Sequence, residues 1–342
     1  MKLYESNRPF ELECGSVLPG ITIAYHTYGS LNADKSNCVW VCHALTANSD
    51  VADWWPHTVE KDRFLDPEKY FIVCANILGS CYGSTGPMSV NPLTGECWYD
   101  TFPRLTIRDI VKAHILLADH LGIGRIASLI GSSVGGFQAV EWAVMQPGRF
   151  RSAVLIATDA YASPWTIAAD ETQRMAILAD PTFGERRAGA GAAGLAAARA
   201  IGMLTYRGAK GYNRSQKDIP VENDNLWQLR RAVTYQRHQG QKLVKRFDAY
   251  SYMAILNAFD THNVGRGRGG VEKALSLLKM PVMVVSITTD IIFTSEEMKH
   301  LSSFIPAAVY TEIESDFGHD GFLVEHEALN RIIKEFFETN HI

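Results

Sequence analysis

The sequence predicts an α/β protein with a mostly parallel central sheet and helices on both of its faces. Short, continuous apolar runs such as residues 38–42 are typical of strands that are buried on both faces. These runs alternate with segments of helical spacing, as in sheets whose parallel strands are joined by helices. In addition, a Gly-x-Ser-x-Gly pentapeptide at residues 131–135 separates one apolar run from a helix-like stretch. A chain of 342 residues has room for one large domain, or for a core domain with a sizeable insertion.

The elements of the first half follow from their periodicity. Residues 21–28 alternate in part and predict an antiparallel edge strand, whereas residues 38–42 and 70–76 are continuous apolar runs that predict buried strands. Apolar residues between positions 107 and 121 recur at helical spacing and predict an amphipathic helix. Residues 125–129 then predict a strand that leads into the pentapeptide.

In the second half of the chain a long segment interrupts the alternation of strands and helices. Residues 152–158 predict another buried strand, and residues 281–287 and 308–313 predict two more. Between them, residues 163–272 contain no obvious buried strand and read mainly as helices. The glycine-rich stretch 263–270 predicts a flexible return loop.

The helical segment divides the chain into two predicted parts. We expect a core domain of residues 1–162 and 273–342, with a helical lid of residues 163–272 inserted into it. An independent helical domain is the alternative. The lid is favoured because strands resume after the segment, and because active sites gain from being covered.

Composition restricts the class of protein. The chain is 46% hydrophobic and 20% charged with a formal net charge of −4, so nothing suggests a nucleic-acid partner. No apolar run is long enough to cross a membrane, and the N-terminus lacks the apolar core of a signal peptide, which predicts a cytoplasmic protein. The six cysteines include no Cys-x-x-Cys pair and the eleven histidines show no metal-ligand spacing, so we expect no metal site.

The pentapeptide places Ser133 where a nucleophile is held at the end of a strand. A serine hydroxyl needs a base to take its proton, and a histidine oriented by a carboxylate can do this near neutral pH. In sheet-based hydrolases the order along the chain is Ser, acid, His. Asp290 follows the strand at 281–287 and His319 lies in the turn-rich loop after residues 308–313, so we predict a Ser133–His319–Asp290 triad.

Rival residues are less suitable for the triad. Ser132 is not the middle residue of the pentapeptide, and Asp316 is close to His319 in sequence and does not end a strand. Asp290 could instead only cap a following helix, and a single loop histidine is often a surface residue. Ser133, Asp290 and His319 occur along the chain in the order that the triad requires, and this order favours a catalytic role for all three.

An acyl transfer also needs hydrogen-bond donors where negative charge develops, and losing one typically costs on the order of 100-fold in rate. One donor should be the backbone N–H of Val134, directly after the nucleophile. The other should come from the loop after an early strand, and we assign it to the backbone N–H of Leu45.

Five motifs make the chain resemble the homoserine O-acetyltransferase family, whose members have the α/β-hydrolase fold. They are residues 42–46, 78–87, 106–109, 133–143 and 318–323, which together span most of the core domain. The lid resembles the family chiefly at residues 198–207. The sequence departs from the family at Ser132, at Val134 and at residues 47–50, which leaves the identities of the acyl donor and of the acceptor open.

The resemblance implies ping-pong acyl transfer in methionine biosynthesis. Ser133 would take the acetyl group of acetyl-CoA, and the hydroxyl of L-homoserine would then accept it, with His319 as the base. The resemblance further implies that Arg199, Tyr206 and Asp320 hold the amino acid. The chemistry is consistent with this, because a guanidinium binds a carboxylate well and a carboxylate binds an ammonium group well.

Related enzymes leave alternatives open, namely succinyl-CoA as donor, serine as acceptor, or water as acceptor in an esterase or thioesterase. Acetyl-CoA is expected as a co-substrate and no cofactor as permanently bound. The resemblance also suggests a homodimer, formed through the lid. Seven lid cations are candidates for the CoA phosphates, although a solvated basic face explains them equally well: Arg186, Arg187, Lys210, Arg214, Lys242, Lys245 and Arg246.

Overall fold

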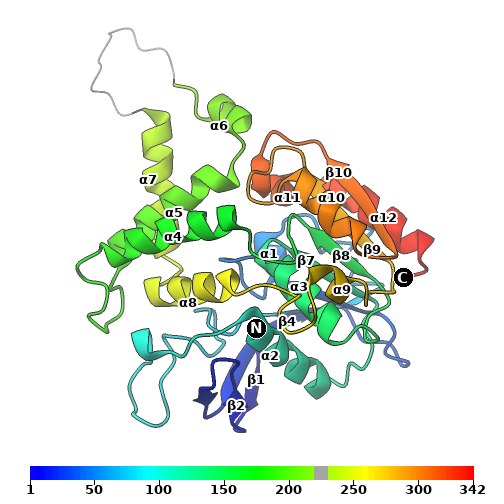
Figure 1. Ribbon diagram of the computed structural model, residues 1–342, viewed down its shortest axis with the longest axis horizontal. Helices are drawn as coiled ribbons and strands as arrows, with labels where there is room; N and C mark the ends of the chain where they lie inside the picture. The colour runs from blue at the N-terminus through cyan, green and yellow to red at the C-terminus, as the bar shows by residue number, and fades with distance from the viewer. Residues whose placement is uncertain (219–229) are drawn as a thin grey trace.

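An eight-stranded sheet forms the centre of the computed structural model, which describes residues 1–218 and 230–342 (Figure 1). The strands lie in the order β1-β4-β6-β5-β7-β8-β9-β10. The strands from β6 to β10 in this order pair in parallel, and β4 pairs antiparallel with both β1 and β6. Their bounds are β1 Lys2–Ser6, β4 Ile21–Tyr28, β5 Cys38–Cys42, β6 Phe71–Ala75, β7 Ser128–Ser132, β8 Ala153–Ile156, β9 Val282–Ile287 and β10 Ala308–Ile313; β2 (Phe10–Glu11) and β3 (Val17–Leu18) form a separate two-stranded sheet.

The predicted sheet is confirmed, with two corrections. β4 is antiparallel as predicted, but it is not an edge strand, because β1 pairs with it from Lys2 opposite Tyr25 to Ser6 opposite Ile21. β1 has no buried residue, so its sequence carries little of the apolar signal that marks a strand. β7 also begins later than predicted, at Ser128, and extends to Ser132, because Ser132 still pairs with Ile156 of β8.

Helices cover both faces of the sheet and two separate clusters of buried side chains hold them there. One cluster joins the sheet to α2, α3 and α10, and the other joins it to α1 and α12. The bounds in this part of the chain are α1 Val51–Trp54, α2 Ile107–His120, α3 Val134–Met145, α9 Val271–Leu275, α10 Ser295–Ser303, α11 Gly321–Val324 and α12 His326–Thr339, with 3₁₀ turns at η1 Tyr99–Thr101 and η2 Gly318–Asp320. α2 begins where its sequence predicts, at a capping box between Thr106 and Asp109.

Between β8 and α9, the described residues form five helices that group beside the sheet (Figure 1). They are α4 Pro164–Leu178, α5 Ala192–Tyr206, α6 Ala209–Ser215, α7 Arg231–Val244 and α8 Ala249–Asp260. Ser163 caps the start of α4 with its side chain, and Pro164 occupies the first helical position, where its missing N–H costs nothing.

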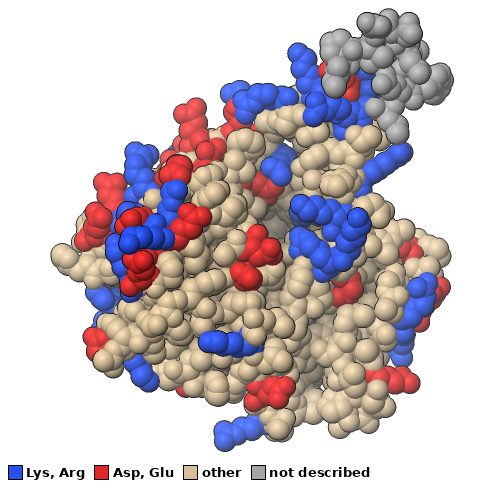
Figure 2. Space-filling model, turned by 180° about the vertical axis from the view of Figure 1, so that it is seen from behind, with Lys and Arg blue, Asp and Glu red and all other residues tan. Residues whose placement is uncertain are grey.

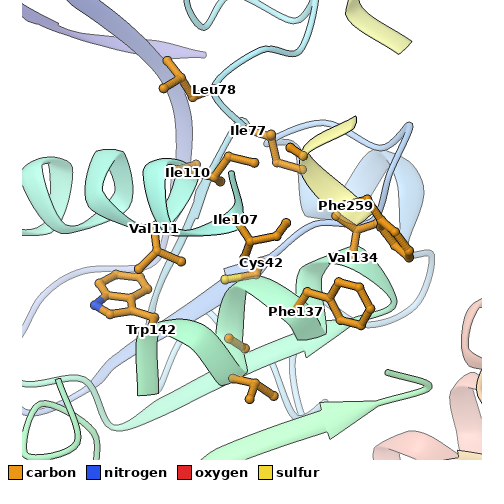
Figure 3. Packing of buried hydrophobic residues seen from close by; sticks show 14 of the residues in the cluster. Cys42, Ile77, Leu78, Ile107, Ile110, Val111, Val134, Phe137, Trp142 and Phe259 are labelled. Atoms are coloured by element: carbon orange, nitrogen blue, oxygen red, sulfur yellow. The ribbon is translucent and has the colours of Figure 1, made fainter. Parts of the chain in front are cut away.

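These five helices, α4 to α8, are called the insertion below, and α8 packs it against the core. Figure 3 shows Phe259 of α8 beside Val134 and Phe137 at the start of α3. The rings of Phe137 and Phe259 lie 4.5 Å apart between centroids. The helix that follows the pentapeptide is therefore covered by the insertion directly.

Charged groups are distributed unevenly over the surface. In Figure 2, Lys and Arg side chains gather over the upper part of the insertion, whereas acidic and basic groups mix elsewhere on this face. The described helices α6 and α7 contain basic residues and no acidic one. None of the helices in residues 1–218 and 230–342 combines the length and the apolar character needed to cross a membrane.

Candidate active site

Ser133 lies at the sharp turn between β7 and α3. Its backbone has φ 55° and ψ −127°, a strained conformation for a residue with a side chain. The Ser133 N–H donates to the carbonyls of Ile156 (3.0 Å) and Ala157 (3.1 Å). In return, the Thr158 hydroxyl donates to the Ser133 carbonyl at 2.9 Å. These bonds to β8 and the residues after it hold the strained turn in place.

Helix α3 approaches β5 unusually closely, and this approach requires glycine. A Cβ atom on Gly135 would lie 2.0 Å from the carbonyl oxygen of Cys42. The buried Gln138 amide joins the same two segments, because its Nε2 donates to the carbonyls of Val134 (3.1 Å) and His43 (3.2 Å). The start of α3 and the loop after β5 are thus held side by side.

His319 lies between the Ser133 hydroxyl and the Asp290 carboxylate. Its Nε2 is 2.9 Å from Ser133 Oγ, and its Nδ1 is 2.7 Å from Asp290 Oδ2. The other carboxylate oxygen of Asp290 accepts the backbone N–H groups of Ile292 (2.8 Å) and Phe293 (3.1 Å). The carboxylate therefore has a fixed orientation and favours a proton on His319 Nδ1, which leaves Nε2 free to accept one from the serine.

Burial and charge oppose each other at His319. Burial alone lowers the pKa of the imidazole, but the Asp290 carboxylate attracts the proton and raises that pKa above its ordinary value of 6.5. The nearby Asp320 acts in the same direction. The site therefore stabilises the imidazolium that forms when His319 takes a proton.

A cavity of about 610 Å³ opens onto the Ser133 hydroxyl. Asp290 does not line it, since it lies behind His319. The other seven residues predicted for the site all line the cavity: Leu45, Ser133, Val134, Arg199, Tyr206, His319 and Asp320. The structure therefore brings together residues from both halves of the core and from the insertion.

The peptide that carries the Leu45 N–H is held by its own carbonyl, that of Ala44. His43 Nδ1 lies 2.8 Å from this oxygen, and the Ala47 N–H donates to it at 3.0 Å. The Ile77 N–H donates to His43 Nε2 at 3.0 Å, so the proton of this ring is on Nδ1. Burial lowers the pKa of His43 to about 4, so the ring stays neutral. These contacts orient the peptide rigidly, as a preorganised donor requires.

The three residues expected to hold an amino acid lie around the same cavity. The Arg199 guanidinium lies over the Tyr206 ring, 5.4 Å from its centroid, and forms no ion pair with any residue in 1–218 or 230–342. Burial raises the pKa of Tyr206 to about 12, so its hydroxyl stays protonated and can donate. Asp320 follows His319 and forms an ion pair with Arg207, with 3.0 Å between Nε and Oδ2.

Arg207 is a partner of the cavity-lining Asp320 that the sequence did not indicate. It follows Tyr206 directly, but its partner Asp320 lies more than 100 positions away, and no spacing rule joins them. The same holds for Gln173, which lines the cavity and accepts a hydrogen bond of 2.5 Å from the Tyr252 hydroxyl. Both contacts depend on how the insertion packs.

The insertion also contacts the loop that carries His319. Gly318 has φ +67°, and a Cβ atom there would lie 2.4 Å from the backbone nitrogen of Gly208. The Gly211 N–H donates to the Asp316 carbonyl at 3.2 Å. The segment between α5 and α6 therefore packs directly against the loop that carries His319.

Two of the seven candidate cations, Lys242 and Arg246, line the cavity. Four others form ion pairs and do not line it: Arg186 with Asp100, Arg187 with Glu185, and both Lys210 and Arg214 with Asp316. Asp316, the rival acid, is thus directed to surface cations. The rival nucleophile Ser132 ends β7 and does not line the cavity.

Comparison with known proteins agrees with this architecture. The chain matches the α/β hydrolase fold family over residues 37–326. It is 44% identical over 340 residues to the homoserine O-acetyltransferase of Cyclobacterium marinum, covering 99% of this chain and 96% of that protein. Among solved structures, two crystal structures illustrate the shared fold. The homoserine O-acetyltransferase from Bacillus anthracis has a TM-score of 0.89 and 23% identity, over 98% of this chain and 97% of that one. An acetylester hydrolase from Corynebacterium glutamicum has a TM-score of 0.86 and 25% identity, over 98% and 96%. The full-length identity shows that this chain belongs to the homoserine O-acetyltransferase family.

Proposed function

We propose that this protein transfers an acetyl group from acetyl-CoA, through Ser133, to the side-chain hydroxyl of L-homoserine, as the acylation step of methionine biosynthesis. The observation that carries the proposal is the content of one cavity. It contains a Ser133–His319 pair at 2.9 Å, a guanidinium without an ion pair among the described residues, and the half-buried carboxylate of Asp320. This set suits an amino-acid acceptor better than water.

In the first half-reaction Ser133 Oγ attacks the thioester carbonyl while His319 Nε2 takes its proton. A bond forms between Oγ and the carbonyl carbon, and the negative charge passes to the carbonyl oxygen. The tetrahedral intermediate then collapses, the carbon–sulfur bond breaks, and the imidazolium gives its proton to the departing thiolate. The products are CoA with a free thiol and acetyl-Ser133.

The backbone N–H groups of Leu45 and Val134 are proposed to receive the negative charge. Val134 is the first residue of α3, so its N–H has no acceptor within the helix and benefits from the positive end of the helix dipole. The Gln138 amide keeps the two donor segments together. The two N–H groups would thus already be oriented toward the developing oxyanion and would need no rearrangement during the reaction.

In the second half-reaction the homoserine hydroxyl replaces CoA. His319 Nε2 takes the hydroxyl proton as the oxygen attacks the acetyl carbon, and the bond from that carbon to Ser133 Oγ breaks. The proton returns to Ser133, and O-acetyl-homoserine leaves. Each half-reaction therefore uses the same base and the same two donors.

Arg199 and Tyr206 are proposed to bind the acceptor's carboxylate and Asp320 its ammonium group. A planar guanidinium binds a carboxylate through two parallel hydrogen bonds, and its stacking on Tyr206 fixes its plane. Asp320 follows His319 in the chain. If Asp320 binds the ammonium group of homoserine, the hydroxyl, which three carbon atoms separate from that ammonium, would lie near His319. Lys242, which lines the cavity on the basic α7, is suited to a CoA phosphate.

The insertion is proposed to act as a lid over this cavity. The boundary expected between residues 272 and 273 falls inside α9, so a boundary in front of Val271 keeps that helix whole. Large apolar side chains remain exposed on the lid, including Trp165, Met175 and Leu178 of α4 and Leu204 of α5. They support a homodimer formed through the lid, which light scattering tests by mass. A cytoplasmic location and the absence of a permanently bound cofactor remain predictions.

Hydrolysis is the second candidate, since an acetylester hydrolase shares the fold at 25% identity. Succinyl-CoA and L-serine also remain alternative substrates. The test is thiol release from acetyl-CoA or succinyl-CoA, each with L-homoserine, L-serine or no acceptor. Rapid release only with acetyl-CoA and homoserine supports the proposal. Release that needs no amino acid identifies water as the acceptor, and Ser133→Ala must abolish release in either case.

Arg199→Ala separates the transferase from the hydrolase further. We expect the KM for homoserine to rise about 10- to 100-fold, because a hydrogen bond to a charged group is worth about 1.5–3 kcal/mol, while acylation of Ser133 changes little. Arg186→Ala is the matched control, because Arg186 is a lid arginine that pairs with Asp100 outside the cavity. An unchanged KM for homoserine in Arg199→Ala contradicts the assigned carboxylate site.

A further inference from the structure

Arg246 lies in the connection between α7 and α8 and reaches from the lid to the loop after β5. Its guanidinium donates to the Thr46 carbonyl through Nη1, and Nη2 lies 3.5 Å from Thr46 Oγ1. Nη1 also donates to the Tyr82 hydroxyl at 2.6 Å. The side chain thus bridges three segments that are distant in sequence.

The residue that Arg246 holds belongs to the turn that carries a proposed oxyanion donor. Residues 44–47 form this turn, which is closed by the Ala47 N–H donating to the Ala44 carbonyl at 3.0 Å. His43 fixes the start of the turn through the Ala44 carbonyl. Arg246 fixes its other end through Thr46, so the Leu45 peptide lies between two anchored points.

The backbone around Arg246 is itself fixed. The Cys81 thiol donates to the Arg246 carbonyl at 3.6 Å, and the rings of Tyr82 and Phe247 meet edge to face with 5.6 Å between their centroids. Phe247 is buried, and Asp248 caps α8 by accepting the Ser251 N–H. Arg246 therefore projects from a rigid point of the lid and is not a freely moving surface cation.

We propose that Arg246 is a positioning residue, which holds the turn 44–47 so that the Leu45 N–H is aimed at the developing oxyanion. In this arrangement the lid contributes to the rate of acyl transfer as well as covering the cavity. The inference rests on the proposed acylation of Ser133. A donor displaced by a fraction of an ångström loses much of its hydrogen bond in the transition state, which lowers the rate without changing which substrate binds.

The competing interpretation is that Arg246 binds a phosphate of CoA, since it also lines the cavity. A phosphate-binding cation affects only donors that contain CoA. A residue that positions the turn affects every acyl donor, because all of them develop the same oxyanion. The small ester p-nitrophenyl acetate contains no phosphate and distinguishes the two roles.

The experiment measures the pre-steady-state burst of p-nitrophenol from p-nitrophenyl acetate, and in parallel thiol release from acetyl-CoA with homoserine. We compare the wild type with Arg246→Met, Arg246→Lys and the control Arg237→Met, which removes an exposed arginine of α7 that does not line the cavity. In Arg246→Met we expect acylation to slow about 10- to 100-fold with both donors, as for partial loss of an oxyanion donor. The KM for homoserine should change less than about 3-fold, Arg246→Lys should recover part of the rate, and Arg237→Met should match the wild type.

Three outcomes overturn the proposal. In Arg246→Met, the burst with p-nitrophenyl acetate is unchanged while the KM for acetyl-CoA rises, or the acylation rate is unchanged with both donors. In the third outcome, Arg237→Met loses as much acylation rate as Arg246→Met. If Arg246→Met fails to fold, Arg246→Lys and Tyr82→Phe are judged by the same burst. Failure of the proposed function looks different, because then the wild type itself does not release CoA from acetyl-CoA in a homoserine-dependent way.

Discussion

The Nε atom of Arg207 lies 3.0 Å from the Oδ2 atom of Asp320, so the carboxylate proposed to bind the acceptor's ammonium already faces a cation. Burial raises the pKa of Asp320, whereas Arg207, His319 and Arg199 oppose that rise. The net pKa is still above the ordinary value of 3.8. Arg207 therefore helps to keep this half-buried carboxylate charged, so that it can bind a second cation.

Replacing Asp320 by Asn removes the charge and preserves the size of the side chain. We expect the KM for homoserine to rise about 10- to 100-fold, because a charged hydrogen bond worth about 1.5–3 kcal/mol is lost. Acylation by p-nitrophenyl acetate should stay within about 3-fold of the wild type, since that step involves no ammonium. Steady-state and burst kinetics measure the two effects. Asp316→Asn is the control from the same loop, and an equal rise in KM there contradicts a specific role for Asp320.

The rate of Ser133 acylation should rise with pH through an apparent pKa above 6.5. His319 accepts a proton only when it is neutral, and Asp290 raises the pKa of its imidazole, so the basic form becomes populated later than in an ordinary histidine. In Asp290→Asn burial acts without the carboxylate, so the midpoint should move to lower pH and the plateau rate should fall on the order of 10³- to 10⁴-fold. Burst rates between pH 5 and 9 give both values. A wild-type midpoint at or below 6.5 contradicts the assignment.

Adding one methyl group at Gly135 should damage the site from within. The Cβ atom of Gly135→Ala would lie 2.0 Å from the Cys42 carbonyl oxygen, and neither α3 nor β5 can yield without moving Ser133 or the turn 44–47. We expect a loss of about 3 kcal/mol or more of unfolding free energy, and loss of acylation. Gly148→Ala is the matched control, since nothing lies within 4 Å of its added Cβ and it should be neutral or slightly stabilising. Denaturant unfolding of both variants checks the contrast.

Asp159 should make the fold less stable as pH rises through neutrality. Burial raises the pKa of this carboxyl to about 7, and Glu297 acts in the same direction. A folded-state pKa above the unfolded value means that the stabilisation is complete below about pH 4 and is lost as pH rises through about 7. Asp159→Asn cannot ionise, and its amide oxygen can still accept the Ala160 N–H that Asp159 Oδ1 accepts. The variant should gain unfolding free energy over the wild type between pH 5 and 8.5, up to about 4 kcal/mol. A difference independent of pH contradicts the raised pKa.

The part of the fold that was predictable is the part with simple periodicity. Continuous apolar runs identify β5 and β6 because both of their faces are buried, and helical spacing identifies α2 from Ile107 onward. β1 was missed because its residues are exposed or only half-buried. The exposed edge strand β1 is therefore a part of this sheet that apolar patterning did not indicate.

Within the site, chain order was enough to select the residues that meet. Ser133, Asp290 and His319 each follow a strand whose neighbours are parallel, so their loops converge at one edge of the sheet. The partners Arg207 and Arg246 were not predicted in their observed contacts. Their hydrogen bonds and ion pairs depend on how the lid helices lie against the core, and no local pattern encodes that arrangement.

The close contact between Gly208 and Gly318 limits which helical insertions from related proteins this core can accept. These two backbones approach so closely that a Cβ atom on either would overlap the other segment. A chimera that takes its helical insertion from another member of the family therefore needs matching residues at 316–320 as well. These two distant stretches of sequence must then be exchanged together, and recombination that separates them should yield less stable chimeras in which the loop that carries His319 is displaced.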